Sequence, residues 1–238
     1  MEPSVIWHLG PFALRGTTIL WSWIAMAVVV LLFFLASRGA SVEKPTKIQN
    51  VLEFIYDFIS GFLHERFGED DGKRSELFYL LIAIFMFILV ANILGLVPFF
   101  HSATNDANTT LGLAFVVFVM IHIQGVRYRG GLGHLGSFFK PYPFLFIFAL
   151  IEAFTSPLTL GLRLFGNIFA GDVLLQLGSG ASPAIVSGAG HIITFVGSVL
   201  MQLLALGFNT FVDLIQAFVF FVLTLTYVAG SMGPAGEH

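Results

Sequence analysis

Five stretches of the chain are apolar over lengths that suit helices crossing a membrane. A bilayer core about 30 Å thick takes about 20 apolar residues of helix. The candidate spans are residues 18–36, 77–99, 111–125, 144–177 and 192–229. The third is short, and the last two are longer than a perpendicular crossing requires. We therefore predict an all-α, polytopic membrane protein with about five transmembrane helices, forming a single integral membrane domain over residues 1–238.

A further helix is predicted between the first two spans, over residues 51–67. Apolar side chains recur there near helical spacing, while Glu53 and Asp57 lie on the opposite side. This pattern is typical of helices that lie along a membrane surface. We expect the segment to be interfacial.

The two longest segments allow two interpretations. Residues 144–177, as a helix rising 1.5 Å per residue, extend roughly 51 Å. A straight helix of that length fits a core of about 30 Å only with a tilt beyond the usual range. Either the helices break, with Pro157 as the candidate position, or both lie steeply inclined as a long hairpin.

Composition agrees with a membrane protein and excludes several classes of function. The mean hydropathy is +0.90 and 11% of the residues are charged, which lies outside the soluble range. The net charge of -3 offers no basic surface for nucleic acid, and the chain has no cysteine for disulfides or thiolate chemistry. The sequence has no glycine-rich phosphate loop, and its scattered histidines form no haem or zinc pattern. We expect no nucleotide, cofactor or metal.

Loop charges predict the orientation in the membrane. The basic residues that flank the early spans are Arg38, Lys44, Lys47, Arg127, Arg129 and Lys140. Residues 101–110 carry no lysine or arginine, so the positive-inside rule places them outside and the basic loops in the cytoplasm. The first apolar run ends in Ser37 and Arg38 rather than at a small-residue cleavage site, so we read it as a retained helix. The N-terminus is then external and the C-terminus cytoplasmic.

Arg163 interrupts the fourth apolar segment and requires an explanation. A guanidinium at mid-membrane costs roughly 2.5 to 3.5 kcal/mol on insertion scales, and such residues usually mark an ion path or a buried partner. An arginine near a span end that snorkels to the interface is the alternative. At 100° per residue, one helical face carries the residues Glu152, Ser156, Thr159, Arg163, Asn167 and Ala170. The small residues on this face let another helix approach closely, whereas Asp172 points to the opposite side.

A second polar stripe follows the last segment, where Gln202, Asn209, Asp213 and Gln216 share a face. Hydrogen bonding between helices is one interpretation and suits the amides. An acid among phenylalanine, valine and leucine favours a role for Asp213 in proton or ion passage. The two stripes together predict an ion-conducting subunit whose partner docks against the Arg163 face. A stand-alone secondary transporter or channel that binds an anionic solute at Arg163 is the alternative, and a structural membrane anchor would leave both stripes unexplained.

Four stretches resemble subunit a of F-type ATP synthases. The strongest is Leu-Gly-Leu-Arg-Leu-Phe-Gly-Asn-Ile-Phe-Ala-Gly at 160–171. The others are Val-Ala-Asn-Ile-Leu-Gly-Leu-Val-Pro at 90–98, Ala-Thr-Asn-Asp-Ala-Asn-Thr-Thr at 103–110, and the pair 215–220 and 223–227. They occur in the same order as in that family and cover most of the chain after residue 70.

The resemblance implies the stator side of a rotary motor that carries protons or sodium ions. The subunit would pack against a ring of c subunits and the peripheral stalk subunit b, in an energy-coupling membrane such as the bacterial plasma membrane, while catalysis lies in other subunits. Arg163 matches the essential arginine of the family. It would lower the pKa of the c-subunit carboxylate and, because it keeps its proton, block a direct leak.

The same resemblance implies two offset half-channels on either side of Arg163. The candidates for the external one are Asp172, Asn209, Asp213 and Gln216, and those for the cytoplasmic one are Glu152 and Ser156, with Asn167 close to the arginine. The chain departs from the family at two of these positions. Asp172 stands where glutamate is common, and Asn209 stands where an ionisable residue is usual. We expect Asp213, one helical turn on, to take over that function.

Overall fold

The computed structural model describes residues 6–9, 12–38, 44–68, 71–96, 102–139, 142, 144, 146–180 and 190–232, and most of them are helical. In chain order the elements are β1 (Ile6–Leu9), β2 (Phe12–Arg15), α1 (Gly16–Arg38), α2 (Lys47–Phe67), α3 (Asp71–Gly95), η1 (Ala103–Asn105), α4 (Ala107–Arg129), α5 (Gly131–Ser137), α6 (Phe146–Gly180) and α7 (Gly190–Met232). Helices α1, α3, α4, α6 and α7 are long and apolar enough to cross a membrane. The predicted all-α polytopic fold with five spans is confirmed.

The ends of α3 and α4 differ from the predicted ends, and a capping side chain and a proline account for the differences. Helix α4 is longer than the predicted span 111–125, because the side chain of Asp106 accepts a hydrogen bond from the backbone N–H of Asn108 and caps its start. Helix α3 ends at Gly95, whereas the prediction continued to residue 99. Pro98 disfavours helical geometry at the residue before it, and residues 97–99 lie outside the described part of the chain.

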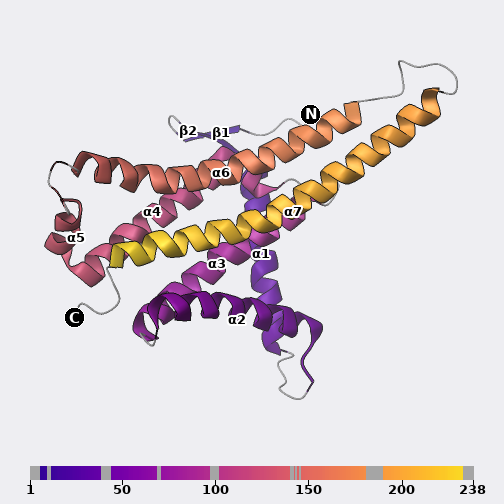
Figure 1. Cartoon of the computed structure of the whole chain (residues 1–238). Coiled ribbons are helices and arrows are strands. Elements are labelled where there is room, and N and C mark those ends of the chain that lie inside the picture. The colour runs from indigo at the N-terminus through magenta and orange to yellow at the C-terminus, as the bar shows by residue number, and fades with distance from the viewer. Residues whose placement is uncertain are drawn as a thin grey trace.

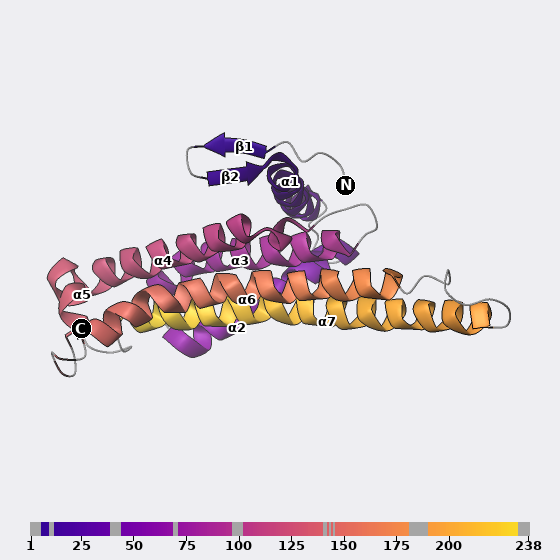
Figure 2. The same ribbon diagram turned by 90° about the horizontal axis from the view of Figure 1, so that it is seen from above.

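Helices α6 and α7 form the long inclined hairpin that was one of the two alternatives. They lie side by side (Figures 1 and 2), and both run at a large angle to α1 (Figure 1). Helix α6 does not break at Pro157 but continues through it. Because proline has no N–H, the backbone carbonyl of Ala153, four residues earlier, loses its usual helical donor at this point.

The core lies where α3, α4, α6 and α7 pack together. Its fully buried side chains include Leu81 and Ile88 of α3, Leu164 of α6, and Phe220 and Phe221 of α7. Lipid tails are as apolar as these side chains, so close packing rather than escape from water holds the helices together. The bundle thereby fixes the register between α6 and α7, which carry the two polar stripes.

Helix α2 closes one end of the bundle, beside the end of α1 (Figure 1). It starts at Lys47, earlier than the predicted residue 51, because the hydroxyl of Thr46 accepts a hydrogen bond from the N–H of Gln49. Its Phe58 and Phe62 rings lie 5.6 and 5.9 Å from the Phe218 ring of α7. These contacts attach the helix to the bundle, and its interfacial position stays a prediction.

The short elements β1, β2, η1 and α5 were not predicted. Strands β1 and β2 pair antiparallel, with Ile6 opposite Arg15. Helix α5 occupies part of the segment 127–140, which was expected to be a cytoplasmic turn. Gly130 joins α4 to α5 with a φ of 73°, a left-handed value that glycine adopts readily.

Helix α6 approaches α4 closely at Gly161. A Cβ atom at this position would lie 2.8 Å from the Ala114 Cβ and 2.8 Å from the Thr110 carbonyl oxygen. We expect Gly161→Ala to destabilise the subunit by about 1 to 3 kcal/mol, because overpacking forces the helices apart. Thermal unfolding of the subunit reconstituted in lipid measures the effect. Gly166→Ala on the same helix is the matched control, since a Cβ there meets nothing within 4 Å, and equal stability of the two variants would contradict the prediction.

Candidate functional site

Arg163 lies in the middle of α6 with its side chain exposed. It makes no hydrogen bond or ion pair with any other residue that the structure describes. Thr159 and Ala170 on the same side are also exposed, and a side chain added at Gly166 would meet open space. The face predicted to receive a partner is therefore not covered by the part of the chain that the structure describes.

A first cavity, of ≈360 Å³, opens where α4, α5, α6 and α7 meet. Glu152 and Ser156 of α6 both line it, together with Ala153 and Pro157. Their neighbours across the cavity are His122, Arg129, His134 and Tyr227. Ala153, whose carbonyl Pro157 deprives of its usual helical donor, is thus one of the residues that line this cavity.

A second, much smaller cavity of ≈20 Å³ lies between α3, α6 and α7. Its lining includes Asn92, Ser102, Gly171, Asn209 and Asp213. A volume of this size holds about one water molecule. The wall is polar on several sides, so a water here finds hydrogen-bonding partners.

Asn92 fixes the α3 side of this second cavity. Its side-chain N–H donates to the backbone carbonyl of Asp213 at 3.0 Å, and its Oδ1 accepts from the Thr104 hydroxyl at 2.8 Å. The Ser102 and Thr104 hydroxyls are 2.6 Å apart. The network holds the α7 backbone at Asp213 against α3, and Ser102 is its one hydroxyl residue among those that line the cavity.

Asn209 of α7 lies where the second cavity meets α6. It is buried, and its Nδ2 donates to the Gly171 carbonyl at 3.0 Å. A Cβ at position 171 would lie 2.8 Å from the Asn209 Oδ1, so only glycine permits this approach. Asp213, one turn further along α7, is partly buried and lines the same cavity.

A hydrogen bond between the two long helices lies one turn beyond Arg163. The Nδ2 of Asn167 donates to the Oε1 of Gln216 at 2.6 Å. Gln216 is buried, and its Nε2 has no partner among the described residues. The amide pair sets the spacing of α6 and α7 next to the arginine.

The order of these features along α6 places Arg163 between the two cavities. The first cavity ends at Pro157 and the second begins at Ile168. At 1.5 Å per residue, Arg163 stands about 9 Å along the helix axis from the former and about 8 Å from the latter. The two polar cavities are thus separated along the helix by a segment whose one charged group is the guanidinium.

The structure groups most of the predicted site residues in pairs. Glu152 and Ser156 share the first cavity, and Asn209 and Asp213 share the second. Between the cavities, Asn167 donates a hydrogen bond to Gln216. The Asp172 backbone belongs to α6, but its side chain lies outside the described part of the structure.

Sequence reasoning missed several further residues of these cavities, among them Asn92 and His134. Asn92 carried a usable signal, because it is a lone amide in an otherwise apolar span. His134 carried none, because it follows a glycine-rich turn that was read as a loop. Among the described residues, no three histidine or acidic side chains gather as metal ligands.

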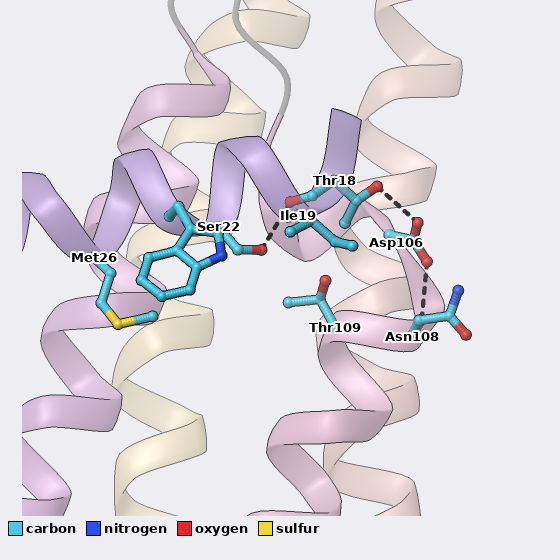
Figure 3. Close-up of a pocket in the computed structure, with 8 residues that line it drawn as sticks. Thr18, Ile19, Ser22, Met26, Asp106, Asn108 and Thr109 are labelled. Atoms are coloured by element: carbon cyan, nitrogen blue, oxygen red, sulfur yellow. Dashed lines mark hydrogen bonds between the residues drawn. The ribbon is translucent and has the colours of Figure 1, made fainter. Parts of the chain in front are cut away.

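A separate cavity of ≈190 Å³ lies between α1 and the start of α4 (Figure 3). The Thr18 hydroxyl donates to the carboxylate of Asp106 at 2.8 Å, while the other oxygen of that carboxylate caps α4. Both oxygens of the acid thus have partners, and the remaining wall, with Ile19 and Met26, is largely apolar. This contact joins α1 to the bundle, and it contributes no residue to either cavity beside Arg163.

Comparison with known proteins gives one consistent result. A family model described as ATP synthase A chain matches residues 19–229. The chain is similar to ATP synthase subunit a of Desulforamulus reducens, with 34% identity over 238 residues, covering 100% of this chain and 87% of the relative. It is also similar to ATP synthase subunit a of Lysinibacillus sphaericus, with 37% identity over 232 residues, covering 93% and 94%. The subunit of the same name from Priestia megaterium is 37% identical over 215 residues, covering 87% of each chain.

Proposed function

Because the chain belongs to the ATP synthase A chain family, we propose that it conducts ions through the two cavities, with Arg163 as the electrostatic barrier between them. The protein is a multi-pass subunit of a bacterial plasma membrane that takes part in proton translocation for an F-type ATP synthase, while catalysis lies in other subunits.

The position of Arg163 between two separate polar cavities is the observation that carries the proposal. An ion channel through one subunit would need a continuous polar path, whereas the described residues line two separate cavities, one on either side of Arg163 along α6. An ion that enters one cavity therefore reaches the other only on a carrier that moves. A ring of c subunits turning past α6 and α7 supplies such a carrier.

The second cavity serves as the external half-channel in this proposal, and the first as the cytoplasmic one. The loop that follows α4 is basic, with Arg127 and Arg129 in the last turn of the helix, so the positive-inside rule assigns the α5 end of the bundle to the cytoplasm. A proton entering past Ser102 reaches Asp213, passes to the carboxylate of one c subunit, and leaves after a turn of the ring by way of Glu152 and Ser156. The N-terminus is then external.

Arg163 controls when the c-subunit carboxylate ionises. In lipid the acid is neutral because burial disfavours its charged form, and a cation close by reverses that preference. Each unit of pKa corresponds to about 1.4 kcal/mol. Arginine keeps its own proton, so it favours ionisation of the carrier without offering protons a route of its own.

The uncovered surfaces suit the partners that this role requires. Thr159, Gly166 and Ala170 leave room beside Arg163 for the backbone of a c-subunit helix. Helix α2 exposes Val51 and Phe54, which are 58% and 71% accessible. We assign this second surface to the peripheral stalk, which must hold the subunit still while the ring turns.

Cysteine accessibility tests the two half-channels directly. The natural chain has no cysteine, so Ser102→Cys and Ser156→Cys each place one thiol of nearly unchanged size at one cavity. In the assembled complex we expect silver ions, which are small enough for both cavities, to inhibit Ser102→Cys from the external side and Ser156→Cys from the cytoplasmic side. Proton conduction in oriented vesicles, with silver added to one side at a time, measures this.

Thr155→Cys is the matched control. Thr155 neighbours Ser156 in the chain, but its hydroxyl bonds the Ile151 carbonyl of its own helix at 2.7 Å and it lines neither cavity. We expect it to respond weakly from both sides. Inhibition of Ser102→Cys and Ser156→Cys from the same side would refute two separate half-channels.

A further inference from the structure

His134 is buried, yet neither of its ring nitrogens has a hydrogen-bonding partner among the described residues. Its side chain is 7% exposed and lines the first cavity from α5. Leaving a buried polar group without a hydrogen-bonding partner is unfavourable for folding. A structural role in which the ring only fills space would be served better by an apolar side chain, so this histidine requires another explanation.

His122 of α4 stands beside it at the same cavity. The two ring centroids are 5.4 Å apart, and the Nδ1 of His122 also lacks a partner among the described residues. Phe118 and Phe138 pack against the pair, with ring centroids 4.3 Å from His122 and 5.4 Å from His134 respectively. Two imidazoles are thereby held together at the boundary between an apolar wall and a cavity large enough for water.

Gly125 makes the position of His134 possible. A Cβ atom at residue 125 would overlap the imidazole ring of His134, at Nδ1 and Cε1. Helix α4 therefore has room for this ring only because residue 125 is glycine. The position of the His134 ring therefore depends on Gly125, which does not titrate. A substitution at Gly125 can displace the ring without removing a titratable group.

Burial and two neighbouring groups favour the neutral form of the His134 imidazole. The titratable groups that face it are His122 and Arg129 from α4, Glu152 from α6 and Tyr227 from α7. Burial lowers the pKa of His134, and the nearby His122 and Arg129 lower it further. A neutral imidazole near pH 7 has a free lone pair and accepts a proton from the cavity.

We propose that His134, together with His122, transfers protons between Glu152 and the cytoplasm across the first cavity. The proposal rests on the assignment of this cavity as the cytoplasmic half-channel. During ATP synthesis a protonated Glu152 gives its proton, through water in the cavity, to an imidazole nitrogen, which leaves a carboxylate and an imidazolium. The imidazolium then releases the proton to cytoplasmic water and returns to the neutral form. During ATP hydrolysis the same steps run in reverse.

Passive proton conduction by the membrane sector tests this assignment. The complex is reconstituted in vesicles, the catalytic sector is removed, and a potassium diffusion potential drives protons at values between pH 6 and pH 9. We expect His134→Gln, which keeps a polar side chain but cannot take up a proton, to slow conduction about tenfold at pH 8 and less at pH 6, because general acid–base transfer matters most where free protons are scarce. Added imidazole should restore much of the rate.

Two glycine variants separate proton transfer from structure. Gly125→Ala displaces the His134 ring and should slow conduction in the same direction, whereas Gly136→Ala on the same short helix as His134 meets nothing within 4 Å and should leave it unchanged. An unaltered rate in assembled His134→Gln complexes would overturn the assignment. A slower rate with the wild-type pH profile and no response to imidazole would also overturn it, because that result indicates a structural role.

The same vesicles distinguish this inference from the proposed function. If Arg163→Ala leaves coupled ATP synthesis intact, the two-cavity proposal itself fails. If Arg163→Ala abolishes synthesis while His134→Gln conducts normally, only the assignment of the histidines fails.

Discussion

Arg163→Ala should abolish ATP synthesis by the assembled complex. We expect the rate to fall by at least about 100-fold, which is the loss seen when one preorganised electrostatic contact is removed from an enzyme site. Without the guanidinium, no cation favours ionisation of the c-subunit carboxylate where it meets α6, so the acid stays protonated and carries its proton past both cavities. The barrier between the cavities is removed at the same time, so passive proton conduction should persist. Synthesis and passive conduction measured in the same vesicles test both expectations.

Two further variants isolate the contribution of the permanent charge. Arg163→Lys keeps a cation on α6, but lysine loses its proton far more readily when buried, so we expect synthesis to stay well below that of the wild type. Leu162→Ala changes the neighbouring exposed side chain, which is 49% accessible, and should leave synthesis near the wild-type rate. Coupled synthesis retained by Arg163→Ala would contradict the stator role of this residue.

The fold was largely predictable because lipid restricts what an apolar segment can do. A chain in the hydrocarbon core must satisfy its backbone groups internally, so each long apolar run had to be a helix. The length of residues 144–177 also limited that segment to a break or an inclined hairpin. The choice between them was not predictable, since it depends on how α6 packs against α4 and α7 around Pro157. The close contact at Gly161 shows the kind of packing that decides it.

The helical wheel predicted which residues share a face, but it did not predict which faces meet. Asn209 and Asp213 were placed on one stripe from their spacing, and the structure adds that Asn209 is bound to the Gly171 carbonyl. The hydrogen bond between Asn167 and Gln216 joins the two stripes, and only the register of α6 against α7 brings these amides together. Periodicity contains no information about that register, because it describes each helix alone.

The surroundings of His134 could not be predicted from the sequence at all. This histidine comes from a short helix after a glycine turn, and it gains its surroundings from α4, α6 and α7. Nothing in the local sequence distinguishes it from a loop histidine. Its contact with Gly125, nine residues earlier, depends on the reversal of the chain at Gly130, whose φ of 73° places α5 back against α4. Such a contact becomes visible only when the backbone is known.

Asp213→Asn should lower proton-driven ATP synthesis by about 10-fold to 100-fold, the range of a lost general acid–base group. Asn209 cannot exchange a proton, and its amide is already committed to the Gly171 carbonyl. Asp213 is then the acid at the second cavity whose carboxylate can receive a proton from a water held there. Asparagine has almost the same size, and the hydrogen bond from Asn92 goes to the backbone carbonyl of residue 213, so the substitution removes the titratable group while leaving this contact with α3 in place.

The measurement compares ATP synthesis at equal proton-motive force in complexes that contain equal amounts of the subunit. Asp213→Glu restores an acid and should recover most of the rate, because the relay needs a titratable oxygen rather than one particular side-chain length. Asn92→Ala serves as the opposite control, since it removes the hydrogen bond to the residue 213 carbonyl and leaves the carboxylate in place. Wild-type synthesis by Asp213→Asn would show that Asp213 is not the relay. A packing role for residue 213 between α3 and α7 would give a different result. Synthesis would then stay low in Asp213→Glu and would fall equally in Asn92→Ala, because only a proton relay requires an acid at this position.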